Sequence, residues 1–159
     1  NKASKFNQGF TTTELAGAAL LDLAWGKTDG NGIDVEGFEA DFTKKIGMPD
    51  EITYRYRSPY FKHIFGSDGY ASGYYTYLWA EVLDTDGFEL FSEKGIFDPA
   101  TAKSFKENIL EKGGSEDPME LFVRFRGHEP SVDALLRNRG LAPKSESAKG
   151  GELKTQGGK

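Results

Sequence analysis

Two Asp-Pro dipeptides divide the C-terminal half of this chain into short helices. Each precedes a helix-forming stretch that ends at glycine: Gly113-Gly114 after Asp98-Pro99, and Gly127 after Asp117-Pro118. An aspartate before the first turn accepts hydrogen bonds from amides that otherwise lack a partner. Proline is tolerated in that turn because it has no amide hydrogen, and glycine readily takes the left-handed conformation that closes a helix. This punctuation predicts helices rather than strands.

Four further helices complete an all-α prediction of about five to six helices. They are expected over residues 12–25, 34–46, 131–139 and, with a break or weakening at Gly87, from residues 70–73 to about residue 94. Within 34–46, apolar residues recur at spacings of three and four, as on a helix face that packs against a core. The one alternating run, Glu51 to Arg57, allows at most one short strand pair. The expected fold is an all-α helical subdomain.

The composition argues against several classes of protein. The chain has 159 residues, enough for one domain with a core. It has no cysteine, which excludes disulfides, thiolate metal sites and cysteine nucleophiles. Its net charge of −5 is opposite in sign to the basic surface of nucleic-acid-binding proteins, and no run approaches the roughly 18 apolar residues of a membrane span. We expect no nucleic acid and no membrane as partners; whether the compartment is cytoplasmic or periplasmic stays open.

The C-terminal stretch has a different composition. Residues 142–159 hold four lysines, two glutamates and four glycines but a single leucine. Such a segment buries too little apolar surface to offset the entropy lost on ordering. We therefore expect residues 1–141 to form the helical subdomain and residues 142–159 to be a disordered tail.

The tyrosines are concentrated in one short segment. All seven lie within residues 54–77, which also contain His63, one of two histidines, and the glycine-rich loop 66–69. At about 100° per residue, Tyr74, Tyr77 and Glu81 share one helix face, and Tyr70 joins them if the helix begins there. The other face is expected to be packed and consists of Tyr75, Leu78, Trp79 and Val82.

A row of phenols on one helix face has a specific chemical use. A phenol is a neutral hydrogen-bond donor at neutral pH, so several phenols aimed in one direction suit an oxyanion or a peptide carbonyl. A neighbouring glycine loop lets the backbone and His63 approach a ligand or close over it. The alternative is that the tyrosines are amphipathic residues at the edge of a helical core.

The other motifs do not form a recognisable site. Asp29-Gly-Asn31-Gly begins like a calcium-binding loop, but Ile33 and Asp34 stand where the loop needs a ligand and a glycine. His63 and His128 are 65 residues apart and no His-Glu-x-x-His sequence occurs. We therefore expect no metal-ligating residues in this chain.

The segment from Ser58 to Val82, which carries His63 and most of the tyrosines, closely resembles the signature near the C-terminus of the thimet oligopeptidase family of zinc metallopeptidases. Two further regions agree with that family, within residues 3–25 and 122–140. The resemblance spans residues 1 to about 141 and is strongest to the peptidyl-dipeptidase (dipeptidyl carboxypeptidase) branch. It implies a zinc-dependent hydrolase that cleaves short peptides.

The resemblance also implies which residues of the family bind zinc and activate water, and whether this chain contains them. In that family, two histidines of a His-Glu-x-x-His helix and a later glutamate bind zinc, and the glutamate of the motif activates the attacking water. Since this chain lacks the motif, the resemblance implies the C-terminal part of a larger enzyme, completed by a missing N-terminal part. We expect this chain alone to bind no zinc and to be inactive.

Roles for individual residues follow from the same resemblance. It implies that His63 contacts substrate, that Tyr70 holds the substrate backbone, and that Tyr77 donates to the developing oxyanion. The further substrate-binding residues that it implies are Tyr74, Gly66 and Gly69. No role is carried over for His128.

Two interpretations without catalysis stay open from the residues alone. One is a helical peptide-binding module, and the other is a structural bundle with incidental tyrosines. A His-Glu-x-x-His motif in a longer parent sequence would favour the peptidase, whereas a buried tyrosine face would favour the bundle. The sequence leaves the cleavage preference, dipeptidyl carboxypeptidase or endo-oligopeptidase, and the oligomeric state open.

Overall fold

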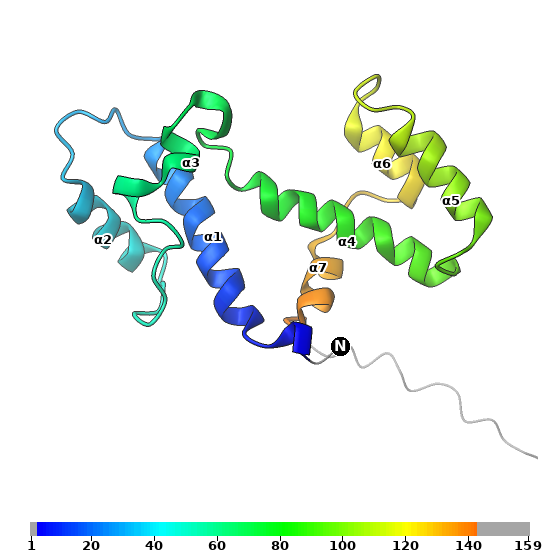
Figure 1. Cartoon of the computed structure of the whole chain (residues 1–159), viewed down its shortest axis with the longest axis horizontal. Coiled ribbons are helices and arrows are strands. Elements are labelled where there is room, and N and C mark those ends of the chain that lie inside the picture. Colours follow the sequence, from blue (N-terminus) through cyan, green and yellow to red (C-terminus); the bar gives the residue numbers. More distant parts are fainter. Residues whose placement is uncertain (1–2, 143–159) are drawn as a thin grey trace, which may run out of the picture.

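The structure is a computed structural model that describes residues 3–142, and over these residues the chain is helical with no strand (Figure 1). The α-helices are α1 (Gln8–Trp25), α2 (Val35–Lys45), α3 (Lys62–Phe65), α4 (Thr76–Lys94), α5 (Pro99–Phe105), α6 (Pro118–Arg126) and α7 (Val132–Arg139). Short 3₁₀ helices are η1 (Ala3–Lys5), η2 (Ser58–Tyr60) and η3 (Asp68–Tyr70), and a π-helical turn, η4 (Lys106–Leu110), continues α5. The all-α prediction is confirmed. The predicted disordered tail lies outside the described residues, apart from Ala142.

The predicted helix starts in the C-terminal half are confirmed by their capping contacts. The Asp98 carboxylate accepts the Thr101 amide at 2.7 Å, and the Asp117 carboxylate accepts two amides of the first turn of α6. The Ser131 hydroxyl caps α7 in the same way. Gly127, at φ +92°, ends α6 in the left-handed conformation that the sequence predicts.

Several predicted boundaries differ from the structure. Helix α1 begins at Gln8, four or five residues earlier than expected, because Asn7 takes the left-handed conformation that separates α1 from η1. Helix α4 begins at Thr76 because Ser72, at φ +57°, breaks the helical path before it. The expected break or weakening at Gly87 is wrong, since α4 runs without interruption from Thr76 to Lys94.

Helix α1 is the centre of the N-terminal half. Its small residues Ala18 and Ala19 are buried against Phe61, Ile64 and Tyr74, which come from the α3 region and from the loop before α4. A second cluster packs α1 against α2 and the segment that follows it; its members are Leu21, Met48 and Tyr54, with Trp25, Phe38, Phe42, Ile46 and Ile52 around them. The alternating run at residues 51–57 therefore supplies core side chains and no strand.

Helix α4 connects this half to the helices that follow it. Helix α7 lies between the N-terminal end of α1 and the middle of α4 (Figure 1). The rings of Phe91, Phe105 and Phe125 pack α4, α5 and α6 together at centroid distances of 5.2–6.1 Å. Arg139 of α7 donates to the Thr12 hydroxyl of α1 at 2.6 Å and pairs with Glu81 of α4. One arginine thus joins three helices.

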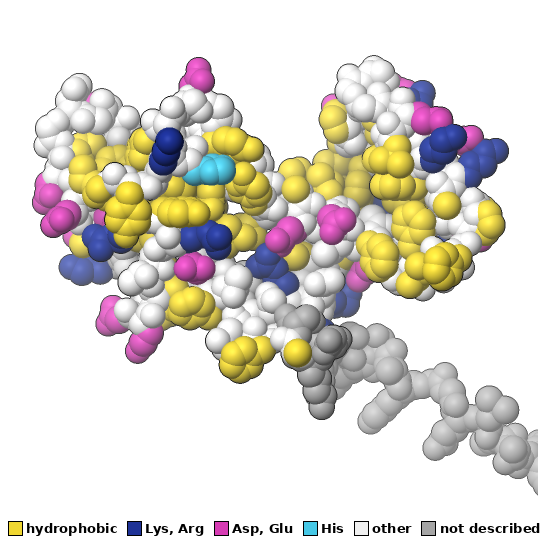
Figure 2. Space-filling view, viewed as in Figure 1, with side chains coloured by type: hydrophobic (Ala, Val, Ile, Leu, Met, Phe, Trp, Pro, Cys, Tyr) yellow, Lys and Arg dark blue, Asp and Glu magenta, His cyan; other side chains and the backbone are white. Residues whose placement is uncertain are grey.

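The surface in Figure 2 is mixed, with hydrophobic side chains gathered over α3 and over the junction of α4 with α5. In the part of the chain that the structure describes, no helix has the length and apolar character needed to cross a membrane.

Candidate functional site

The candidate site forms where α3, η3 and the first turn of α4 meet. Phe61 and Ile64 are buried on both sides of His63 in the sequence. His63 itself is exposed, so the short helix directs the imidazole away from the core. Figure 2 shows a histidine ring over α3, set among hydrophobic side chains.

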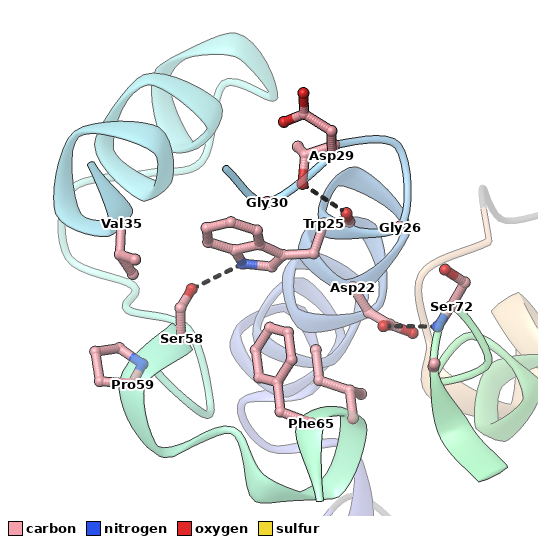
Figure 3. A pocket seen from close by; sticks show the side chains of 13 residues that line it. Asp22, Trp25, Gly26, Asp29, Gly30, Val35, Ser58, Pro59, Phe65 and Ser72 are labelled. Carbon is pink, nitrogen blue, oxygen red and sulfur yellow. Dashed lines mark hydrogen bonds between the residues drawn. The ribbon is translucent and has the colours of Figure 1, made fainter. Parts of the chain in front are cut away.

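A buried polar network fixes the segment that leads into α3. The Glu39 carboxylate of α2 accepts the amide and the hydroxyl of Ser58, each at 2.8 Å, and pairs with Arg57. The Trp25 indole donates to the Ser58 hydroxyl at 2.9 Å (Figure 3). Because a buried carboxylate is stable only when it is well hydrogen-bonded, these contacts hold η2, and hence α3, against α1 and α2.

His63 lies within a cluster of three tyrosine rings. Its Nε2 atom is 2.9 Å from the hydroxyl oxygen of Tyr77. The centroid of the imidazole is 4.5 Å from that of Tyr70 and 5.4 Å from that of Tyr74. The rings of Tyr70 and Tyr77 stack at 5.9 Å with 7° between their planes. The structure thus brings together the four side chains that the sequence singles out, which we name the His–Tyr cluster.

The outer part of the His–Tyr cluster is accessible to solvent. Tyr70 and Tyr77 are 41% and 39% exposed. Hydrogen bonding to the Tyr70 hydroxyl, with smaller effects of desolvation and of neighbouring phenols, raises the pKa of Tyr77 above its ordinary value. Tyr77 therefore keeps its proton at neutral pH and can act as a neutral donor to a polarised carbonyl oxygen.

The predicted division of the helix faces is confirmed for the buried Val82, the partly buried Leu78 and the exposed Tyr77. It is wrong for Tyr74, Tyr75 and Trp79. Tyr74 is 5% exposed and its ring meets that of Phe61 edge-on, whereas Tyr75 and Trp79, expected on the packed face, are 47% and 42% exposed. Tyr74 precedes Thr76, the first residue of α4, so helical angles do not apply to it. Burial raises the pKa of the Tyr74 hydroxyl. The Tyr74 ring contacts Phe61 in the core and also the rings of His63 and Tyr77 in the cluster.

The two glycines of the predicted loop have different surroundings. A Cβ atom at Gly66 would lie 2.6 Å from the Lys62 carbonyl oxygen, so the close return of the chain after α3 needs glycine. At Gly69 the nearest atom would be the Ser67 hydroxyl oxygen, at 3.7 Å, an ordinary contact. Gly66 lines a cavity of about 440 Å³ beside His63, and Gly69 is not among the lining residues.

A separate pocket of about 490 Å³ lies between α1, α2 and η2, and no residue of the His–Tyr cluster lines it (Figure 3). The Trp25 indole stands in its middle, with Val35, Pro59 and Phe65 around it (Figure 3). At one side, the Asp22 carboxylate faces the backbone of Ser72, which belongs to the loop before α4. No pocket was predicted there from the sequence.

An apolar groove of about 440 Å³ opens between α4, α5 and α6. Five phenylalanine rings line it, with Leu83 and Leu121 beside them. No charged side chain other than Asp84 lines it. Gly87 of α4 lines the groove, and a Cβ atom there would lie 3.8 Å from the Phe125 ring.

The described residues offer no site for a catalytic metal. No three side chains among their His, Asp and Glu residues converge to hold an ion. His63 belongs to the His–Tyr cluster, whereas His128 donates from Nδ1 to the Glu129 carbonyl oxygen of its own loop, and its Nε2 atom lies 3.9 Å from Asp86 on α4. These residues therefore do not fit a zinc ion, and we derive no catalytic step through one from this chain.

The buried carboxylates that support the cluster, those of Asp22 and Glu39, were not predicted from the sequence. Asp22 and Glu39 occur on helices whose apolar spacing is readable, but nothing local marks them as partners of residues 72–74 and 57–58. The only available signal is an acidic residue on an otherwise apolar helix face, a position where an unpaired charge is very unfavourable.

Comparison with known proteins gives consistent matches. The sequence profile of peptidase family M3 matches residues 1–141. Dipeptidyl carboxypeptidase of Salmonella typhimurium is 44% identical over 144 residues, covering 88% of this chain and 21% of that protein. Oligopeptidase A of Haemophilus influenzae is 62% identical over 86 residues, covering 54% of this chain and 12% of that protein.

The dipeptidyl carboxypeptidase of Escherichia coli gives a similar result, 43% identity over 143 residues, which is 87% of this chain and 21% of the relative. The chain thus spans between about an eighth and a fifth of the length of these curated relatives.

Proposed function

The chain belongs to peptidase family M3, and from that premise we propose that it supplies the substrate-binding and oxyanion-stabilising groups of a zinc-dependent peptidyl-dipeptidase. The observation that carries the proposal is the 2.9 Å contact between His63 Nε2 and the Tyr77 hydroxyl, in a cluster open to solvent. The expected substrates are short peptides.

Two of the relatives support the peptidyl-dipeptidase branch. The dipeptidyl carboxypeptidases align with 87–88% of this chain, whereas oligopeptidase A of Haemophilus influenzae aligns with 54%. A preference for releasing dipeptides is therefore proposed over endo-oligopeptidase activity. In the complete enzyme, zinc and the general base would come from residues outside this chain.

In the proposed mechanism, Tyr77 acts at the scissile carbonyl. As the carbonyl carbon becomes tetrahedral, negative charge builds up on its oxygen, and a preorganised neutral donor stabilises that charge more than it stabilises the ground state. The raised pKa of Tyr77 keeps the donor protonated through neutral pH. Tyr70 would hold the substrate backbone and His63 would contact substrate from α3; their ring contacts within the cluster support these roles.

The test is to replace Tyr77 by phenylalanine in the full-length enzyme. Loss of one oxyanion donor typically lowers kcat by about 10²–10³, and KM should change only a few-fold because the contact forms in the transition state. Tyr75→Phe is the matched control, since Tyr75 is exposed and makes no ring contact with the His–Tyr cluster among the described residues. Equal kcat values for both variants and the parent would refute the role of Tyr77.

The kinetic constants of Tyr77→Phe also distinguish the proposed peptidase from the alternative function, a helical peptide-binding module. A helical peptide-binding module would lose affinity in Tyr77→Phe without a selective loss in the chemical step. An increase in the dissociation constant for a peptide, with kcat unchanged, would support that alternative.

A further inference from the structure

The Asp22 carboxylate of α1 fastens the loop that leads into α4. Asp22 is 2% exposed. One of its oxygens accepts the Ser72 amide at 2.9 Å (Figure 3), and the other accepts the Tyr74 amide at 2.8 Å. Hydrogen bonds to an ionised acceptor are the stronger kind. A single side chain of α1 thus holds two amides located about fifty residues further along the chain.

The backbone held by Asp22 has an unfavourable conformation. Ser72 has φ +57°, in the left-handed region that residues other than glycine rarely adopt. Such a conformation persists only where its surroundings impose it. Gly26, which follows the last residue of α1, allows the close approach: a Cβ atom there would lie 1.9 Å from the Ser72 hydroxyl oxygen and 3.2 Å from the Ser72 Cβ atom. Asp22 thus holds Ser72 against α1, and the lack of a side chain at Gly26 leaves room for it.

The position of this loop determines the position of the Tyr77 ring. The Tyr77 amide donates to the Tyr74 carbonyl, so Tyr77 is placed by the turn that begins at Tyr74. The Tyr74 ring lies 5.3 Å from that of Tyr77 and 5.4 Å from that of His63. Movement of the Tyr74 backbone would therefore change the distance between the Tyr77 hydroxyl and His63.

From these contacts we propose that Asp22 is a positioning residue: through the amides of Ser72 and Tyr74 it sets the Tyr77 hydroxyl at hydrogen-bonding distance from His63. This inference rests on the proposed function for its catalytic consequence, but its structural content can be tested separately. Asp22 is buried, and it acts on the His–Tyr cluster through the backbone amides that it holds, those of Ser72 and Tyr74.

The structural test compares Asp22→Asn with Asp86→Asn by NMR of the 159-residue chain. An asparagine keeps one oxygen acceptor, so it can hold only one of the two amides. We expect the Ser72 or Tyr74 amide to exchange with solvent about 10- to 100-fold faster, the effect of losing one hydrogen bond to a charged group. The ¹⁵N signal of His63 Nε2 should also shift, because its contact with Tyr77 is altered.

Asp86 is the matched control because it is equally buried and also accepts a backbone amide, that of Ser131 at 2.8 Å. Asp86→Asn should leave the Ser72, Tyr74 and His63 signals unchanged, even if it lowers the free energy of unfolding as much as Asp22→Asn does. Unchanged signals in Asp22→Asn, or the same shifts in Asp86→Asn, would overturn the proposal.

A second variant reaches the same loop without removing a charge, which covers the case in which Asp22→Asn fails to fold. In Gly26→Ala the Ser72 hydroxyl can turn away, but the Ser72 Cβ atom would still lie 3.2 Å from the new methyl group, so Ser72 should move slightly away from α1 and the His63 signal should shift. Adding Ser72→Gly should restore the signal by removing the whole side chain and relieving the left-handed strain. An unshifted His63 signal in Gly26→Ala, or no recovery in the double variant, would contradict the inferred linkage.

The catalytic consequence is measured in the full-length enzyme. Because a displacement of about 1 Å from a distant mutation can cost about 100-fold, Asp22→Asn should lower kcat about 10- to 100-fold and leave KM within a few-fold. If the NMR signals shift but neither Asp22→Asn nor Tyr77→Phe lowers kcat, the proposed function fails and the positioning by Asp22 stands. If Tyr77→Phe lowers kcat and Asp22→Asn does not, the catalytic part of this inference is wrong.

Discussion

The Nε2 atom of His63 and the hydroxyl oxygen of Tyr77 lie 2.9 Å apart across the junction of α3 and α4. Each partner is held by a different buried carboxylate. Glu39 fixes the backbone that enters α3, and Asp22 fixes the backbone that enters α4. The His–Tyr cluster therefore depends on α1 and α2, which contribute no ring to it.

The first prediction concerns zinc. Among the described residues no three metal-ligating side chains converge, and residues 143–159 contain no histidine, aspartate or cysteine. We expect the 159-residue chain to bind zinc no more tightly than an exposed histidine does and to cleave no peptide. Isothermal titration calorimetry with zinc, and a peptidase assay with and without chelator, check this. One tight zinc per chain, or chelator-sensitive cleavage, would disprove it.

The second prediction is that Gly87→Ala stabilises the protein. A Cβ atom at Gly87 would lie 3.8 Å from the Phe125 ring, an ordinary contact, within an uninterrupted helix. Replacing glycine by alanine inside a helix is worth about 0.5–1 kcal/mol, and the free energy of unfolding from chemical denaturation should rise by that amount. Gly127→Ala is the control, and it should lower the free energy of unfolding because alanine is strained at φ +92°. A loss of stability in Gly87→Ala would show that the groove cannot accept a methyl group.

The third prediction concerns the arginine that joins α1, α4 and α7. Arg139→Met keeps a long apolar side chain but loses the hydrogen bonds to Thr12 and Glu81. Because hydrogen bonds to charged groups contribute about 1.5–3 kcal/mol each, the free energy of unfolding should fall by at least about 2 kcal/mol. Arg137→Met, which breaks an exposed pair with Glu89, should cost less than about 1 kcal/mol. Equal losses would show that the burial of Arg139 is unimportant.

The fourth prediction is a pH dependence. Hydrogen bonds from Arg124 and then Lys112 lower the pKa of Glu116 from 4.5 to about 2. Since the folded-state pKa lies below the unfolded one, the stabilisation from this group is complete above about pH 4.5 and is lost as the pH falls to about 2. The stability difference between the parent and Glu116→Gln should therefore shrink across this window. The ¹³C signal of the Glu116 carboxylate reports the pKa directly.

Salt provides the control for that measurement. The groups are exposed, so high salt screens them and should return the pKa of Glu116 toward 4.5. A pKa near 4.5 already at low salt would contradict the ion pairs of Glu116 in the structure.

The sequence predicted the helices well where their ends are set locally. Asp98, Asp117 and Ser131 cap the helices that they were expected to cap, because capping joins groups only two or three residues apart. It failed at the start of α4, because the left-handed Ser72 is imposed by Asp22, fifty residues away. The same cause placed Tyr74 in the core instead of on the open face.

The helical character of the chain, most helix ends, and the distinctive chemistry of His63 and the tyrosines could be predicted from the sequence, since each follows from composition or from contacts between near neighbours. Which phenols are open, Tyr70 and Tyr77, and which is buried, Tyr74, depends on how distant segments pack. That choice depends on amides bonded to a buried carboxylate of another helix. A hydrogen bond between residues so distant along the chain exists only once α1 and the loop before α4 have packed together.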